Sequence, residues 1–96
     1  MTDQSIFLDI GSGFGYPNFL ATSMTGCMGV GVEVSEVRAY RSIALVDEVS
    51  AKKEFNMISW KKLMDFRCQD ACLPRGPFTS RSGDHCTHVF AYNWAQ

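Results

Sequence analysis

A glycine-rich loop between an apolar run and a helix-like stretch constrains the fold of this chain more than any other feature. The run Ile6–Ile10 is short, apolar and stops at a glycine, which is typical of a buried parallel strand. Pro17 is tolerated in the first turn of a helix because its missing N–H group has no partner there. The segment Asp9–Gly15, Asp-Ile-Gly-Ser-Gly-Phe-Gly, includes the end of this run and leads into the helix-like stretch. Its glycines allow a tight turn and let a ligand approach the backbone.

The rest of the chain alternates apolar runs with helical spacing, which indicates a parallel α/β sheet. Further strands are predicted at 28–34, 66–69 and 87–92, and helices at 17–27, 35–49 and 52–64. The predicted helices carry apolar faces formed by Leu20, Met24 and Cys27, by Val37, Tyr40 and Ala44, and by Met57, Trp60 and Met64. The glycines of segment 28–34 indicate that other groups pack close to its backbone. We therefore expect a Rossmann-like parallel sheet with flanking helices.

Composition places the chain among small globular domains. Its 96 residues are 46% hydrophobic and 20% charged, which excludes wholesale disorder and leaves room for one domain. The formal net charge of −1 argues against a dedicated nucleic-acid module. No signal peptide and no apolar run long enough for a bilayer is visible, so we expect an intracellular protein with reduced cysteines and no membrane partner.

Two acidic residues stand where ligands bind in open parallel sheets, at the ends of predicted strands. Glu33 lies 18 residues after Gly15, in the position where a carboxylate meets the hydroxyls of a ribose. Asp70 ends the predicted third strand, within reach of an adenine edge. A tight turn accompanied by two solvated acids is the alternative without a ligand.

The chemistry of the loop narrows the class of ligand. Gly15-Tyr16-Pro17 lacks the Lys and Ser/Thr of a phosphate-binding loop, and the glycine spacing differs from the dinucleotide fingerprint. Asp9 would repel a pyrophosphate and attract a cation. S-adenosylmethionine carries a sulfonium and an ammonium but no phosphate, so it suits an acid-flanked glycine loop.

These residues resemble the cofactor half of the class I S-adenosylmethionine-dependent methyltransferases, in the order Asp9-x-Gly11-x-Gly13-x-Gly15, Glu33, Asp70. The segment Phe7–Gly15 with Pro17-Asn18-Phe19 is similar, more closely, to the disruptor-of-telomeric-silencing (Dot-one) family of histone lysine methyltransferases. The same pattern is fitted by Gly31-Val32-Glu33, Phe78-Thr79 and Thr87–Phe90. The resemblance covers residues 7 to 94, and thus nearly the whole chain as one domain, 1–96.

The resemblance implies roles for the matching positions. The loop would hold the methionine part of the cofactor through Asp9, Gly11, Ser12, Gly13 and Gly15. Glu33 would bind the ribose hydroxyls, and Asp70 with Ala71 would contact the adenine. Asn93 and Trp94, at the end of the fourth strand (87–94), would stand beside the substrate lysine as catalytic residues. Such a site works mainly by positioning an uncharged amine against the methyl group.

The family also implies an acceptor, a histone lysine in a nucleosome, with non-specific DNA contact through the nucleosome and a nuclear location. The family's upstream segment and its strands beyond the fourth have no counterpart here. We therefore expect a cofactor-binding half, which is a fragment, a degenerate copy or a chain complemented by another segment. Tyr16 stands where the family more often has a polar residue. The alternatives are a methyltransferase acting on RNA or a small molecule, and an inactive domain that binds only a ligand or a partner.

A zinc site is the rival interpretation of the second half of the chain. Its donors would be Cys68, Cys72, His85, Cys86 and His88. Finger-like sites pair their ligands more tightly, so we predict no metal site and expect Cys68 to be a buried apolar residue. The aromatic residues expected in the core are Phe14, Phe19, Trp60 and Phe66.

Overall fold

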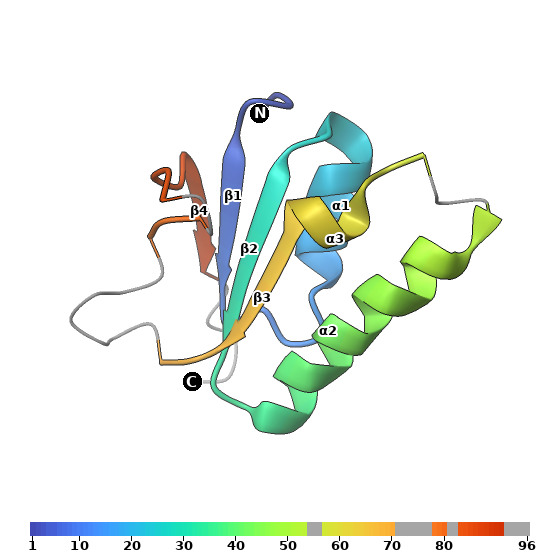
Figure 1. Cartoon of the computed structure of the whole chain (residues 1–96). Helices are drawn as coiled ribbons and strands as arrows, with labels where there is room; N and C mark the ends of the chain where they lie inside the picture. Colours follow the sequence, from blue (N-terminus) through green and yellow to red (C-terminus); the bar gives the residue numbers. More distant parts are fainter. Residues whose placement is uncertain (54–56, 71–77, 81–82, 92–96) are drawn as a thin grey trace.

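The computed structural model describes residues 1–53, 57–70, 78–80 and 83–91. Its strands are β1 (Ile6–Ile10), β2 (Met28–Glu33), β3 (Met64–Cys68) and β4 (His88–Ala91). Its helices are α1 (Tyr16–Thr25), α2 (Glu36–Ala51) and α3 (Trp60–Leu63). All strand pairings are parallel, in the order β3-β2-β1-β4 (Figure 1). The predicted Rossmann-like α/β fold is confirmed.

The helices lie together on one face of the sheet (Figure 1). The core on this face is formed by Val46, Trp60, Met64 and Phe66, with Phe19 packed against them. Gly29 and Gly31 make this packing possible, because a Cβ at Gly31 would lie 2.6 Å from the ring of Phe66. The close approach predicted for the glycines of β2 is therefore confirmed, and the nearest side chains come from β3.

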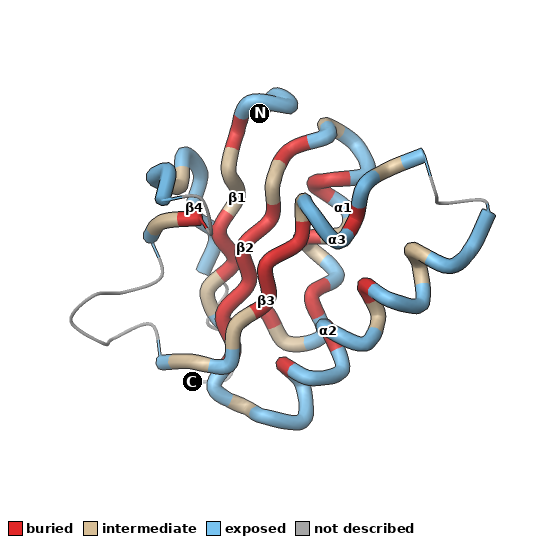
Figure 2. Tube along the Cα trace, in the orientation of Figure 1, coloured by how far each residue is buried: buried red, intermediate tan, exposed pale blue. Residues whose placement is uncertain are grey.

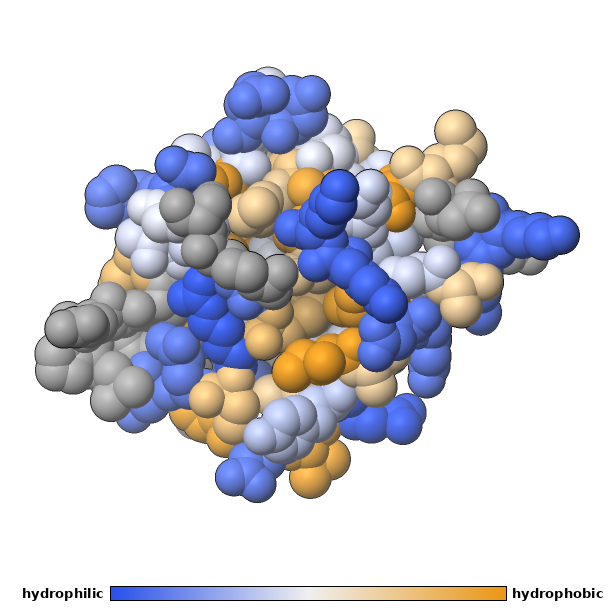
Figure 3. All heavy atoms as spheres, in the orientation of Figure 1, coloured by the Kyte–Doolittle hydropathy of each residue, from blue (hydrophilic) through white to orange (hydrophobic). Residues whose placement is uncertain are grey.

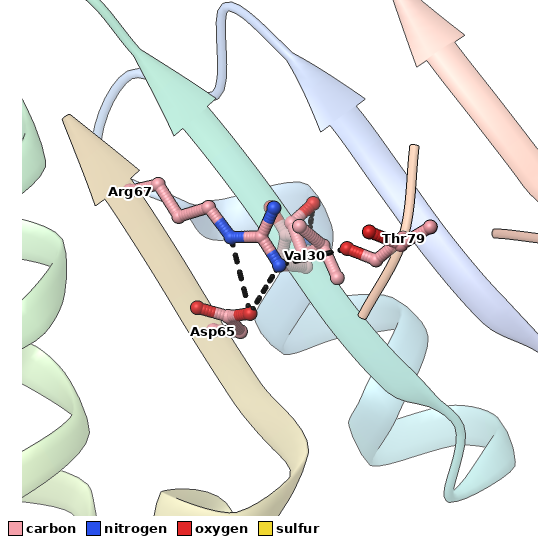
Figure 4. Close-up of polar contacts among 5 residues, drawn as sticks. Val30, Asp65, Arg67 and Thr79 are labelled. Carbon is pink, nitrogen blue, oxygen red and sulfur yellow. Dashed lines mark hydrogen bonds and ion pairs between the residues drawn. The ribbon is translucent and has the colours of Figure 1, made fainter. Parts of the chain in front are cut away.

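Leu8, Val30 and Val32 are buried on the opposite face of the sheet. Buried residues are concentrated along β1, β2 and β3 (Figure 2). On this opposite face the Arg67 guanidinium donates a hydrogen bond of 2.8 Å to the carbonyl of Thr79 and pairs with Asp65 at 2.7 Å (Figure 4). These contacts hold the short segment 78–80 against β3 on the second face of the sheet.

The helix boundaries follow from local signals. Gly15 and Gly26 flank α1 with left-handed backbone, and the Ser35 hydroxyl caps α2 by accepting a hydrogen bond from the Arg38 amide. The helix predicted over 52–64 is correct in part: α3 covers Trp60–Leu63, whereas Lys52 is extended and Met64 begins β3. In the described ranges, no helix has both the length and the apolar character needed to cross a bilayer.

The predicted apolar faces of α1 and α2 are wrong. Leu20 and Met24 are 61% and 76% exposed, Val37 and Tyr40 are also exposed, and Cys27 is buried beyond the end of α1. The residues that face the sheet are Asn18, Ala21 and Thr22 in α1 and Ala39, Ser42 and Val46 in α2. Two of these side chains are tied to the backbone beneath the helices, since the Asn18 amide donates to the carbonyl of Val30 and the Ser42 hydroxyl to that of Gly13. Apolar side chains consequently remain among the polar ones on the surface (Figure 3).

Candidate functional site

The strand order reverses between β1 and β4, because β2 and β3 follow β1 on one side of it and β4 lies on the other. In open parallel sheets, ligands bind beyond the carboxyl ends of the strands at such a switch point. A cavity of about 510 Å³ lies there, lined by Asp9, Gly11, Ser12, Gly13, Phe14, Pro17, Arg38 and Phe90. This volume falls in the range of small-molecule sites.

The glycine loop turns through three left-handed residues, Gly11, Gly13 and Gly15, with φ angles of 72°, 57° and 84°. Residues with a Cβ rarely adopt this conformation, so the sequence folds into this turn only with glycine at these positions. The amides of Gly11 and Ser12 both donate to the carbonyl of Val32, each at 2.9 Å. The loop is thereby anchored to the end of β2, and the predicted tight turn is confirmed.

Glu33, the last residue of β2, stabilises the glycine loop through its side chain. Its buried carboxylate accepts hydrogen bonds from the Gly13 amide at 2.9 Å and from the Ser35 amide at 3.0 Å. The Ser42 hydroxyl, which the sequence did not single out, donates to the carbonyl of Gly13 at 3.0 Å. Gly13 is therefore held through both its amide and its carbonyl, which stabilises this shape of the loop.

Asp9 provides the negative charge of the cavity. The residue is 2% exposed, and burial raises the pKa of its carboxyl from 3.8 to about 6, with a further rise from the charge of Glu33. A buried carboxylate of this kind is stabilised by a neighbouring cation. The geometry therefore suits a ligand that brings positive charge to Asp9 and apolar surface to Phe14 and Phe90.

The structure brings together four of the predicted cofactor residues as cavity lining: Asp9, Gly11, Ser12 and Gly13. Gly15 is buried beneath them, against Phe66. Asp70 is exposed two residues beyond the end of β3, so it does not end the strand as predicted, and it is not part of the cavity lining. Ala71, Asn93 and Trp94 lie outside the described residues, and their roles stay predictions.

Other cavity residues were missed by the sequence. Phe14, expected in the core, is 44% exposed and lines the cavity, so that expectation is wrong. Its position between two turn glycines is the signal that could have shown this, because such a loop lies outside the core. Phe90 lies beside Asp9 in the β1–β4 register, and Arg38 reaches the cavity from the first turn of α2.

The residues considered for a zinc site do not form one in the described part of the chain. No group of three or more His, Cys, Asp or Glu residues is arranged there to hold a metal ion, and Cys72 lies outside it. Cys68, expected to be buried, is exposed at the end of β3, where its thiol contacts the carbonyl of Val34 at 3.8 Å.

No protein-family model and no curated protein sequence matches the chain. Solved structures resemble it. The MccD protein superposes with a TM-score of 0.67 and 21% identity, over 93% of this chain and 33% of MccD. An RNA methyltransferase from Salinibacter ruber, solved in complex with S-adenosyl-L-homocysteine, superposes with a TM-score of 0.63 and 22% identity, over 96% of this chain and 50% of the methyltransferase. The cyclase SpnF superposes with a TM-score of 0.59 and 25% identity, over 77% of this chain and 24% of SpnF.

This chain spans half or less of the length of each of these structures. At such identities the likeness concerns the backbone. The chain therefore has the Rossmann-like α/β fold that the RNA methyltransferase structure also has.

Proposed function

We propose that the cavity at the carboxyl end of β1 binds S-adenosylmethionine and that the chain is the cofactor-binding part of a methyltransferase. The observation that carries this proposal is the buried Asp9 carboxylate in a cavity otherwise lined by the loop residues Gly11–Gly13, by apolar rings and by Arg38. A ligand with two positive groups and no phosphate matches the charge of the Asp9 carboxylate in this cavity. The Salinibacter ruber methyltransferase shares the fold and contains the demethylated form of this cofactor, which supports the proposal.

The residues present fit the cofactor in chemical terms. Asp9 would orient its cationic end, and Phe14 with Phe90 would cover apolar surface beside the loop. Glu33 is buried, accepts hydrogen bonds from the amides of Gly13 and Ser35, and is not among the residues that line the cavity, so its contact with the ribose hydroxyls rests on the sequence resemblance. When bound, the cofactor would supply an electrophilic methyl group, and the residues named here would fix the position of that group.

Two classes of methyl acceptor are compatible with this proposal. The sequence similarity of Phe7–Gly15 to the Dot-one family supports a histone lysine, with Asn93 and Trp94 beside it, a nucleosome as partner and a nuclear location. The likeness to an RNA methyltransferase supports RNA. Transfer of a labelled methyl group to nucleosomes and to RNA, measured side by side, distinguishes the two. Cofactor binding without transfer to either would favour a domain that binds ligand only.

Calorimetric titration of the full chain with S-adenosylmethionine and with S-adenosylhomocysteine tests the cofactor site. We expect Asp9→Asn to weaken binding of S-adenosylmethionine at least tenfold, or about 1.4 kcal/mol. Asp3→Asn removes an exposed acid of the same type and is the matched control, which should bind like the unmodified chain. The absence of heat from a chain shown to be folded by circular dichroism would overturn the proposal.

A further inference from the structure

Two exposed aromatic side chains lie beside each other at the glycine loop, and one of them, Phe14, lines the cavity proposed for the cofactor. Phe14 and Tyr16 are 44% and 67% exposed, and their ring centroids lie 6.2 Å apart at an interplanar angle of 42°. A second hollow of about 160 Å³ is lined by Phe14, Tyr16, Arg41, Leu45 and Glu48. Phe14 lines both spaces, so the second hollow adjoins the cofactor cavity.

Two arginines of α2 accompany these rings. Arg38 lines the cofactor cavity and Arg41 lines the second hollow, and residues three apart on a helix share a face. Glu48 is the acidic residue of the second hollow, and Glu36 lies in the first turn of the same helix. Exposed aromatic rings beside guanidinium groups form a surface on which planar, anionic ligands bind.

We propose that this surface, Phe14, Tyr16, Arg38 and Arg41, binds single-stranded RNA and presents it as the methyl acceptor. This proposal rests on the proposed function, because it names the substrate class of that cavity. Unpaired bases stack on aromatic rings, and arginine binds the phosphates that link them. A lysine-rich histone tail would meet, among the α2 residues that line the two spaces, the like charges of Arg38 and Arg41 and a single acid, Glu48. The net charge of −1 describes the whole chain, whereas recognition depends on the local arrangement of charges.

Fluorescence anisotropy of a labelled oligouridine with the full chain tests the surface. We expect Tyr16→Ala to weaken binding about fivefold or more through the loss of stacking. Arg41→Ala should reduce the slope of log affinity against log salt by about 0.7, the value for one single-strand phosphate contact. Lys52→Ala removes an exposed positive charge at the end of α2 and is the control, with less than a twofold change. A labelled lysine-rich histone tail peptide should bind more weakly than the RNA.

The same variants titrated with S-adenosylhomocysteine separate this proposal from the cofactor proposal. Tyr16 and Arg41 do not line the cofactor cavity, so unchanged cofactor binding with weakened RNA binding supports a distinct acceptor surface. If the unmodified chain, Tyr16→Ala and Arg41→Ala bind RNA equally, the proposed RNA-binding surface is wrong, and the cofactor proposal is unaffected. Tighter binding of the histone peptide also overturns the proposed surface. No heat with the cofactor overturns the cofactor proposal, and RNA is then no longer an acceptor.

Discussion

The carboxylate of Glu33 accepts a hydrogen bond from the amide of Gly13 at 2.9 Å, which joins the end of β2 to the glycine loop. Its other oxygen accepts from the Ser35 amide at the start of α2. One buried side chain therefore connects a strand, a loop and a helix. A loop held by such hydrogen bonds loses less conformational freedom when a ligand binds. The residue predicted to bind a ribose thus also holds the binding loop in place.

Replacing Glu33 with Gln tests this supporting role. The variant keeps the shape of the side chain but turns an amide NH₂ toward one of two backbone donors. We expect the free energy of unfolding at pH 7, measured by urea denaturation, to fall by about 1–3 kcal/mol. Glu48→Gln changes an exposed acid and should alter that free energy by less than about 0.5 kcal/mol. Equal stability of Glu33→Gln and the unmodified chain would contradict the role.

Asp9 should make stability depend on pH. Its folded-state pKa of about 6 lies above the ordinary value of 3.8, so the folded chain binds the proton more tightly than the unfolded chain. Ionised Asp9 therefore lowers stability above pH 6, and this cost disappears as the pH falls through 6 toward 4. A shift of this size corresponds to about 3 kcal/mol at most.

Asp9→Asn should accordingly be more stable than the unmodified chain at pH 7.5 and nearly equal to it at pH 4. Chemical denaturation at both pH values measures the difference, and Asp3→Asn provides the control for removing an acid. The same substitution is expected to weaken cofactor binding, so stability and binding would change in opposite directions. A variant that is less stable at pH 7.5 would show that the Asp9 charge is compensated in the folded chain.

The features that the sequence predicted correctly depend on neighbours along the chain. The strand Ile6–Ile10, the glycine turn and the Ser35 cap each follow from a few consecutive residues. The faces of the helices were wrong because they depend on what lies beneath them. Asn18 faces the sheet, for example, because its side-chain amide donates to the carbonyl of Val30 at 3.1 Å, a contact that apolar spacing cannot reveal.

The candidate site shows the same difference between features set by neighbouring residues and features set by long-range contacts. Asp9 at the end of β1 and the glycines of the next turn are neighbours along the chain, so their spacing predicted that they act together. Phe90 and Arg38 come from β4 and α2, and only the strand order and helix packing bring them to that loop. Long-range contacts of this kind leave no periodic signal in a single sequence.

Gly31→Ala tests the close packing of β2 against β3. The new Cβ would lie 2.6 Å from the Phe66 ring and 3.0 Å from the Cβ of Ser12, so the core must shift. We expect a loss of about 1–3 kcal/mol in the free energy of unfolding. Gly83→Ala meets no atom within 4 Å but has a φ of +90°, so it reports backbone strain alone, at about 1 kcal/mol. Adding Phe66→Leu to Gly31→Ala should cost less than the sum of the two single changes, and strict additivity would contradict the steric cause.

Arg67→Met tests the ion pair on the opposite face of the sheet. The change removes the bonds to Asp65 and to the Thr79 carbonyl while keeping much of the apolar stem. Because both charged side chains are mostly shielded from water, we expect the free energy of unfolding to fall by about 1–3 kcal/mol. Lys61→Met breaks an exposed pair with Asp47 and should cost less than about 1 kcal/mol.

Hydrogen exchange then shows whether Arg67 fixes the segment 78–80. The Ser80 amide donates to the carbonyl of Asp84 at 2.7 Å, so it reports the order of this segment. In Arg67→Met its exchange should accelerate more than that of the Val30 amide in the central sheet, because local opening needs less free energy than global unfolding. Uniform acceleration at both amides would mean that Arg67 stabilises the whole domain and does not specifically fix this segment.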